Sequence, residues 1–114
     1  MSAIKGVKIL LHPVADLTAA KGVYVSLLGI QPQADSDYYV GFDLGGQHIG
    51  LYPAGPDSSK SPVTYFEVDD LDAKLAEVVA AGATVKEPPA KVGGSRRIAT
   101  FTDLDGNVLG LVQD

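Results

Sequence analysis

The 114-residue sequence contains no cysteine. A disulfide framework, a thiolate zinc site and a cysteine nucleophile are therefore excluded. No apolar run approaches the roughly 20 residues that a membrane span requires, and the opening residues lack the apolar stretch of a secretory signal. We therefore expect a cytoplasmic protein with no membrane partner.

Positive charge is also scarce in this chain. Nine Lys and Arg residues against 14 Asp and Glu residues give a net charge of −5, and only Arg96 and Arg97 are adjacent cations. Without a basic stripe to follow a phosphate backbone, a nucleic acid is not an expected partner. An apolar fraction of 46% with 20% charged residues is typical of folded proteins, which argues against a disordered chain.

The two halves of the chain carry the same motifs in the same order. Residues 14–17 (Val-Ala-Asp-Leu) return as residues 68–71 (Val-Asp-Asp-Leu), and residues 49–51 (Ile-Gly-Leu) return as residues 109–111 (Leu-Gly-Leu). Each half alone has about fifty residues, which is small for a stable core, so we expect both halves to pack as one domain. The expected boundaries are module one at about 4–53, a linker at 54–62 and module two at about 63–113.

Each half predicts one helix. Asp16 and Asp70 are candidate N-caps, because a carboxylate can accept hydrogen bonds from the free amides of a first helical turn. Gly29 and Gly82 are candidate stops. Between these signals, apolar residues fall at helical spacing: Leu17, Ala20, Tyr24, Leu27 and Leu28 in the first half, and Leu71, Leu75, Val78 and Val79, as a buried stripe, in the second.

The remaining apolar runs predict strands. They lie at residues 7–12, 39–44, 47–52, 63–68, 84–86, 97–102 and 108–112, with a further short strand at 31–33. Gly45-Gly46 predicts a hairpin and Asp105-Gly106-Asn107 predicts a turn. Residues 53–62 and the segment bracketed by Pro88-Pro89 and Gly93-Gly94-Ser95 are expected to be loops.

These motifs together resemble the vicinal oxygen chelate superfamily of glyoxalases, bleomycin-resistance proteins and extradiol dioxygenases. Asp16-Leu17, Tyr24 and Leu28-Gly29 resemble the opening of the family's first module. Residues 102–107 resemble its closing Asp-Pro-Asp-Gly-Asn turn, with Leu104 in place of proline. The resemblance covers essentially the whole chain. It implies an α+β fold in which two tandem βαβββ modules form one cupped eight-stranded mixed sheet with helices on the outer side, and it implies a homodimer.

The resemblance also implies a divalent metal, held by His, Glu or Gln side chains from the first and last strands of each module. By comparison with glyoxalase I, two ligand positions fall on Ile9 and Val63, and the two glutamate positions fall on Gly50 and Gly110. None of these four side chains can bind a metal. We therefore expect no cofactor, with a divalent metal only if the site is displaced.

Polar and aromatic side chains remain near these positions. Because residues two apart on a strand share a face, His48 and Tyr52 should face the cup with Gly50. Tyr65 and Glu67 should do so with Val63, whereas His12 should point toward the helix layer. The candidate ligand-binding residues are His48, Tyr52, Tyr65, Glu67, Tyr39, Phe42 and Arg96.

Three functions are compatible with this residue set. The first is metal-free binding of a small organic molecule in an aromatic cup. The second is a lyase, isomerase or dioxygenase activity, with a displaced metal site or with His48 and Glu67 as an acid/base pair. The third is a structural or regulatory dimer whose cup is filled by its own side chains. Structural alternatives also exist for single residues: an ion pair for Glu67, a solvated loop for Arg96 and core packing for the tyrosines.

Overall fold

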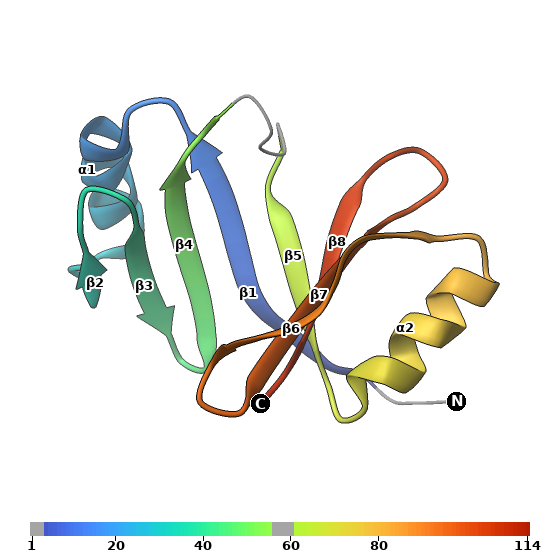
Figure 1. Cartoon of the computed structure of the whole chain (residues 1–114). Helices are drawn as coiled ribbons and strands as arrows, with labels where there is room; N and C mark the ends of the chain where they lie inside the picture. The colour runs from blue at the N-terminus through green and yellow to red at the C-terminus, as the bar shows by residue number, and fades with distance from the viewer. Residues whose placement is uncertain (1–3, 56–60) are drawn as a thin grey trace. The chain divides into compact units, whose positions relative to one another are not determined.

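The computed structural model describes residues 4–55 and 61–114 (Figure 1). The chain divides into two compact units. Module one is the unit Ile9–Val63, and module two combines Met1–Lys8 with Thr64–Asp114. Of the linker expected at 54–62, residues 56–60 lie outside the described residues.

Module one carries the first helix and the first strands of the chain. Its elements are β1 (Ile4–Val14, whose first residues belong to module two), α1 (Leu17–Leu28), β2 (Ala34–Asp35), β3 (Val40–Leu44) and β4 (Gln47–Pro53). The strand order is β2-β3-β4-β1. β1 and β4 are parallel and the other pairs are antiparallel.

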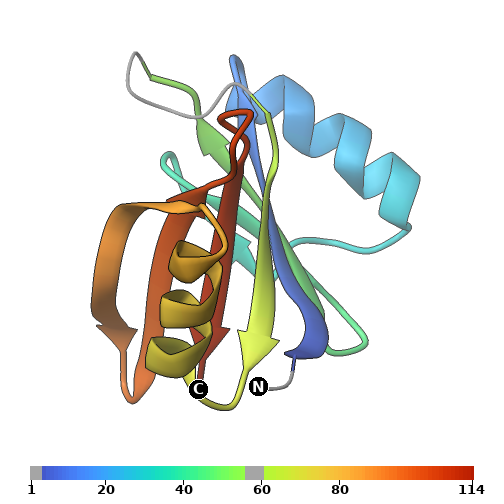
Figure 2. The same ribbon diagram turned by 90° about the vertical axis from the view of Figure 1, so that its right-hand side faces the viewer.

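Module two repeats this arrangement. Its elements are β5 (Val63–Val68), α2 (Leu71–Ala80), β6 (Thr84–Gly93), β7 (Arg96–Thr102) and β8 (Val108–Gln113), with strand order β5-β8-β7-β6. β5 and β8 are parallel, and α2 lies against the strands of its own module (Figure 2). The α+β class, with an eight-stranded mixed sheet and two helices, is confirmed.

Both helices begin where the sequence predicts. The Asp16 carboxylate accepts a hydrogen bond from the Ala19 amide at 3.1 Å, and Asp70 accepts one from the Ala73 amide at 3.0 Å. Gly29 ends α1 with φ of 72°, a left-handed conformation that favours glycine. These caps satisfy backbone groups that a helix end leaves without partners. No helix among the described residues is long and apolar enough to cross a membrane.

Each helix covers one face of its module's sheet. In module one the fully buried side chains are Val40, Phe42 and Leu51, against which α1 packs Leu17, Ala20, Tyr24, Val25 and Leu28. In module two the buried cluster is Val68, Leu71, Leu75, Ala99, Phe101 and Leu111. Leu27 and Val79 lie outside these cores, at 72% and 43% exposure. The expected burial of Val79 is therefore wrong.

Two strand predictions also need correction. The short strand expected at residues 31–33 lies instead at Ala34–Asp35. The loop expected around Pro88-Pro89 is part of β6, which runs from Thr84 to Gly93. β6 is an edge strand whose pairing with β7 shifts register between Glu87 and Ala90. Prolines are tolerated there because a shifted edge strand does not need every N–H.

Strand register divides the side chains of module one between the helix face and the opposite face, which we call the distal face. Phe42 pairs with Ile49, whereas Asp43 pairs with His48. Phe42 is completely buried on the helix face and stacks on Tyr24, with ring centroids 6.4 Å apart. Phe42, which the sequence predicts to bind a ligand, thus lies in the core of module one, on the face opposite His48.

His12 lies on the helix face of module one, as alternation along β1 predicts. Its Nδ1 atom is 2.7 Å from the Tyr24 hydroxyl, and the two rings meet edge to face. Burial lowers the pKa of His12. This histidine therefore joins α1 to the sheet and is not a candidate ligand.

The burial of Phe42 predicts a structural rather than a binding defect on its removal. Phe42→Ala should lower the free energy of unfolding by about 3–5 kcal/mol, because it removes a buried ring and leaves a cavity. Tyr38→Ala is the matched control, since Tyr38 is 81% exposed and should change stability by less than about 0.5 kcal/mol. Urea unfolding followed by circular dichroism measures both. Equal midpoints for the two variants would contradict this placement of Phe42.

Candidate functional site

A tyrosine ring lies against a glycine backbone in each module. In module one, a Cβ atom added to Gly50 would lie 2.1 Å from the Tyr39 hydroxyl oxygen and 2.8 Å from Leu11 Cδ2. In module two, a Cβ atom added to Gly110 would lie 2.4 Å from Tyr65 Cδ2. Ordinary carbon contacts need about 3.5–4.0 Å. Both tyrosine positions therefore require glycine beneath the ring.

These glycines are two of the four positions at which the family resemblance implies metal ligands. The other two are Ile9 and Val63, whose side chains have no donor atom. The residues present therefore do not fit the family's metal, which needs His, Glu or Gln side chains at these positions. Within residues 4–55 and 61–114, no group of three or more His, Cys, Asp or Glu side chains could hold a metal ion.

Three polar side chains on the distal face of module one form a continuous hydrogen-bonded chain. Asp43 Oδ1 is 2.7 Å from His48 Nδ1, and His48 Nε2 is 2.5 Å from the Tyr39 hydroxyl oxygen. The His48 and Tyr39 rings are nearly parallel, with an interplanar angle of 7°. Both ring nitrogens of His48 therefore have partners on the same face of the module.

Local structure explains how these side chains meet. The Gly45-Gly46 turn, with φ of 50° and 94°, joins β3 and β4 and sets Asp43 opposite His48. Tyr39 is held just before β3 by Ser36, whose hydroxyl accepts from the Tyr39 amide at 3.1 Å and donates to the Tyr39 carbonyl. The chain of contacts is thus fixed by one hairpin and one serine turn.

The environment keeps the Tyr39 phenol protonated. Burial raises the pKa of Tyr39, and the negative charge of Asp43 raises it further. In the neutral imidazole, one tautomer satisfies both contacts: Nε2 accepts from the Tyr39 O–H, and the proton on Nδ1 is donated to the Asp43 carboxylate, which can only accept. Asp43 is 63% exposed and His48 is 25% exposed, so the chain of bonds begins at the surface and runs inward.

Two candidate residues of module two, Glu67 and Arg96, belong to one ionic network. Lys8 Nζ is 3.9 Å from both Glu67 Oε2 and Asp114 Oδ2, and Arg96 Nε donates to Asp114 Oδ1 at 2.5 Å. The hydrogen bond from Arg96 lowers the pKa of Asp114. Glu67 therefore forms an ion pair with Lys8, which is the structural role that the sequence offered as the alternative to ligand binding.

The predicted site residues are divided between the two modules. Tyr39 and His48 are in direct contact within module one, where Tyr52 is partly buried and burial raises its pKa. Tyr65 is only 6% exposed and belongs to module two, as do Glu67 and Arg96. The proposed partners His48 and Glu67 thus belong to different modules; His48 contacts Asp43, and Glu67 pairs with Lys8.

Asp43 is the functional candidate that the sequence analysis missed. A signal for it was present, because a two-residue turn at Gly45-Gly46 fixes which residues of β3 and β4 face each other. Counting outward from that turn places Asp43 opposite His48, as the register shows. The same count places Phe42 on the other face.

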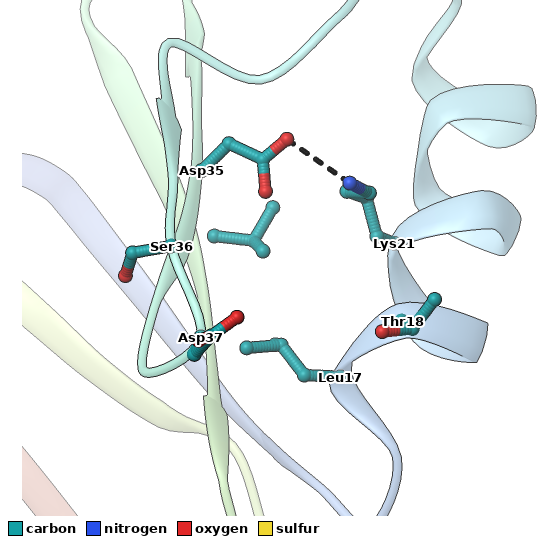
Figure 3. A pocket seen from close by; sticks show the side chains of 7 residues that line it. Leu17, Thr18, Lys21, Asp35, Ser36 and Asp37 are labelled. Carbon is teal, nitrogen blue, oxygen red and sulfur yellow. Dashed lines mark hydrogen bonds and ion pairs between the residues drawn. The ribbon is translucent and has the colours of Figure 1, made fainter.

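A hollow of about 270 Å³ lies between α1 and the segment around β2 (Figure 3). The Lys21 ammonium and the Asp35 carboxylate, 3.0 Å apart, meet across it. Its lining residues are Leu17, Thr18, Lys21, Asp35, Ser36, Asp37 and Val40. The sequence did not predict this hollow, because α1 and the segment around β2 are brought together by tertiary packing.

Comparisons with known proteins agree with the fold and the motifs. The family model "Glyoxalase/Bleomycin resistance protein/Dioxygenase superfamily" matches residues 7–111. "Putative glyoxylase CFP32" of Mycobacterium bovis, and of Mycobacterium tuberculosis, is 32% identical over 86% of the chain. The chain spans 41% of the length of these curated relatives.

Solved structures of low sequence identity share the fold. A Mn(II)-bound glyoxalase from Novosphingobium aromaticivorans has a TM-score of 0.83 at 24% identity, covering 100% of this chain and 40% of that one. Methylmalonyl-CoA epimerase from Mycobacterium tuberculosis has a TM-score of 0.71 at 22% identity, covering 99% of this chain and 90% of that one.

Because Tyr65 lies against Gly110, adding a methyl group at residue 110 should destabilise the protein. Gly110→Ala should lower the free energy of unfolding by about 1–3 kcal/mol, because the buried ring must move. The loss should be smaller in a Tyr65→Ala background, where the ring is absent. Thermal and urea unfolding of the four proteins of this cycle measure the coupling.

The control for this cycle is Gly22→Ala. Gly22 lies inside α1 and has no atom within 4 Å of an added Cβ, so alanine should stabilise the helix by up to about 1 kcal/mol. An equal loss for Gly110→Ala with and without Tyr65 would show that the ring does not set the requirement for glycine.

Proposed function

Because the chain belongs to the Glyoxalase/Bleomycin resistance protein/Dioxygenase superfamily, we propose that it binds a small organic molecule without the family's usual metal. The single observation that carries this proposal is the contact of tyrosine rings with Gly50 and Gly110. At both positions, where the resemblance implies glutamate ligands, this chain has an aromatic ring and no donor side chain.

The chemistry of the distal face of module one supports an aromatic or cationic ligand. Tyr39, His48 and Tyr52 place flat rings and hydrogen-bonding atoms on this face, and such side chains bind flat ligands by stacking. The net charge of −5 favours cations over anions in the approach of a ligand. A cationic ring can also interact with the faces of the tyrosines.

An enzymatic function is the second candidate. The names of the relatives, glyoxylase and methylmalonyl-CoA epimerase, describe enzymes. His48 and Glu67 were expected as the acid/base pair, yet the carboxylate that contacts His48 is Asp43. A lyase, isomerase or dioxygenase activity in this chain would need either a displaced metal site or acid/base chemistry through His48. The homodimer and the cytoplasmic location stay predictions.

Ligand binding can be tested with probes of known shape and charge. ¹⁵N-labelled protein titrated with indole, quinoline and benzyltrimethylammonium should show shifts of backbone amides in β3 and β4 for at least one probe. Tyr52→Ala should then weaken that probe about threefold to tenfold, because a ring contact contributes roughly 0.5–1.5 kcal/mol. Leu104→Ala, at a residue 84% exposed in module two, is the control and should leave the affinity unchanged.

The same titration separates metal-free binding from a displaced metal site. Adding MnCl₂ or NiCl₂ should leave the affinity for the probe unchanged, since the four family positions have no donor side chain. A large gain in affinity with metal would instead support the displaced site. Absence of any probe-dependent shift would contradict the binding proposal and favour a structural dimer.

A further inference from the structure

We propose that Tyr39, His48 and Asp43 form a nucleophilic triad in which the Tyr39 oxygen accepts an acyl group from a small activated ester. This is a covalent activity and goes beyond the reversible binding proposed above. It rests on the hydrogen-bonded chain of module one, whose three members come from β3, β4 and the turn before β3.

The triad has the order of contacts that activates a hydroxyl group. A nucleophile needs a general base within about 2.6–3.2 Å, and that base needs a third group to orient it. His48 Nε2 lies 2.5 Å from the Tyr39 oxygen, and Asp43 lies 2.7 Å from the opposite ring nitrogen. The bond to Asp43 fixes the tautomer in which Nε2 is free to accept the phenolic proton.

The acyl transfer balances with these three side chains and an ester alone. The Tyr39 oxygen forms a bond to the ester carbonyl carbon while its proton moves to His48 Nε2. The carbon–oxygen bond to the leaving group breaks, and the leaving group takes the proton from His48. A water molecule then gives a proton to His48 Nε2 as its oxygen bonds to the acyl carbon. The bond between that carbon and the Tyr39 oxygen breaks, the carboxylic acid leaves, and the Tyr39 oxygen takes the proton back from His48. Asp43 stabilises the imidazolium in both steps and is a positioning residue.

Glycines on the neighbouring strands hold Tyr39 in this place. A Cβ atom at Gly41 would lie 2.6 Å from His48 Cε1 and 2.9 Å from Tyr39 Cε2. A Cβ atom at Gly50 would collide with the Tyr39 hydroxyl. Since side chains at either position would displace the triad, the two glycines serve the geometry of Tyr39 and His48 together.

Two other tyrosines of the same module provide internal comparisons. Tyr38 is 81% exposed, and its side chain has no described histidine partner. Tyr24 bonds His12, but this pair lies in the core between α1 and the sheet, and no described carboxylate contacts His12. If exposure alone governed reactivity, Tyr38 would be acylated first. If the triad governs it, Tyr39 is acylated first.

The experiment treats the full chain with p-nitrophenyl acetate, follows p-nitrophenol release and locates the acetyl group by peptide mass spectrometry. Tyr39 should be acetylated faster than Tyr38, and Tyr39→Phe should abolish this label. General-base assistance contributes roughly 10²–10⁴-fold, so His48→Gln should slow acetylation of Tyr39 by at least about 100-fold. Tyr38→Phe is the matched control and should leave the rate at Tyr39 unchanged.

The positioning role of Asp43 is tested by a measurement that would not change if Asp43 only stabilised the fold. In ¹⁵N spectra of the imidazole, His48 should carry its proton on Nδ1 in the native protein and lose this preference in Asp43→Asn. Asp43→Asn should also slow acetylation of Tyr39, and circular dichroism should show that each variant is folded. Acetylation of Tyr38 before Tyr39, or an unchanged rate in His48→Gln, would overturn the proposal. Neither result bears on reversible binding of the aromatic probes, which is measured separately.

Discussion

Tyrosine side chains lie directly against the backbone of Gly50 and Gly110, and this contact constrains both modules. Any side chain at these positions would collide with the Tyr39 hydroxyl or with the Tyr65 ring. The same contact relates the two glycines to the two tyrosines. Gly50 and Gly110 are the positions that the resemblance assigns to metal-ligating glutamates, and a tyrosine side chain lies over each of them.

In module one, the tyrosine that lies over the glycine also contacts a histidine. Tyr39 lies over Gly50 and also bonds His48, which in turn bonds Asp43. In module two, Tyr65 lies over Gly110, and Lys8 and Asp114 link Glu67 and Arg96 in an ionic network. The two modules share a fold, and the candidate reactive group proposed above belongs to module one.

Local signals predicted most of the fold. The caps at Asp16 and Asp70 and the turn at Gly45-Gly46 depend on a few neighbouring residues, and all three are confirmed. The path of β6 through Pro88-Pro89 could not be predicted, because it depends on its position at a sheet edge. Of the site, alternation along the strand predicted the face of His12. Phe42 was assigned without the hairpin register, and Asp43 was overlooked for the same reason.

The central claim is that aromatic side chains have replaced the family's metal ligands, and metal content tests it most directly. The protein would be produced in medium supplemented with Mn, Fe, Co, Ni and Zn, purified without chelators or a histidine tag, and measured by elemental analysis. We expect far less than one metal ion per chain. A stoichiometric amount of one metal would contradict the claim and would place a displaced metal site at the centre of this protein's function.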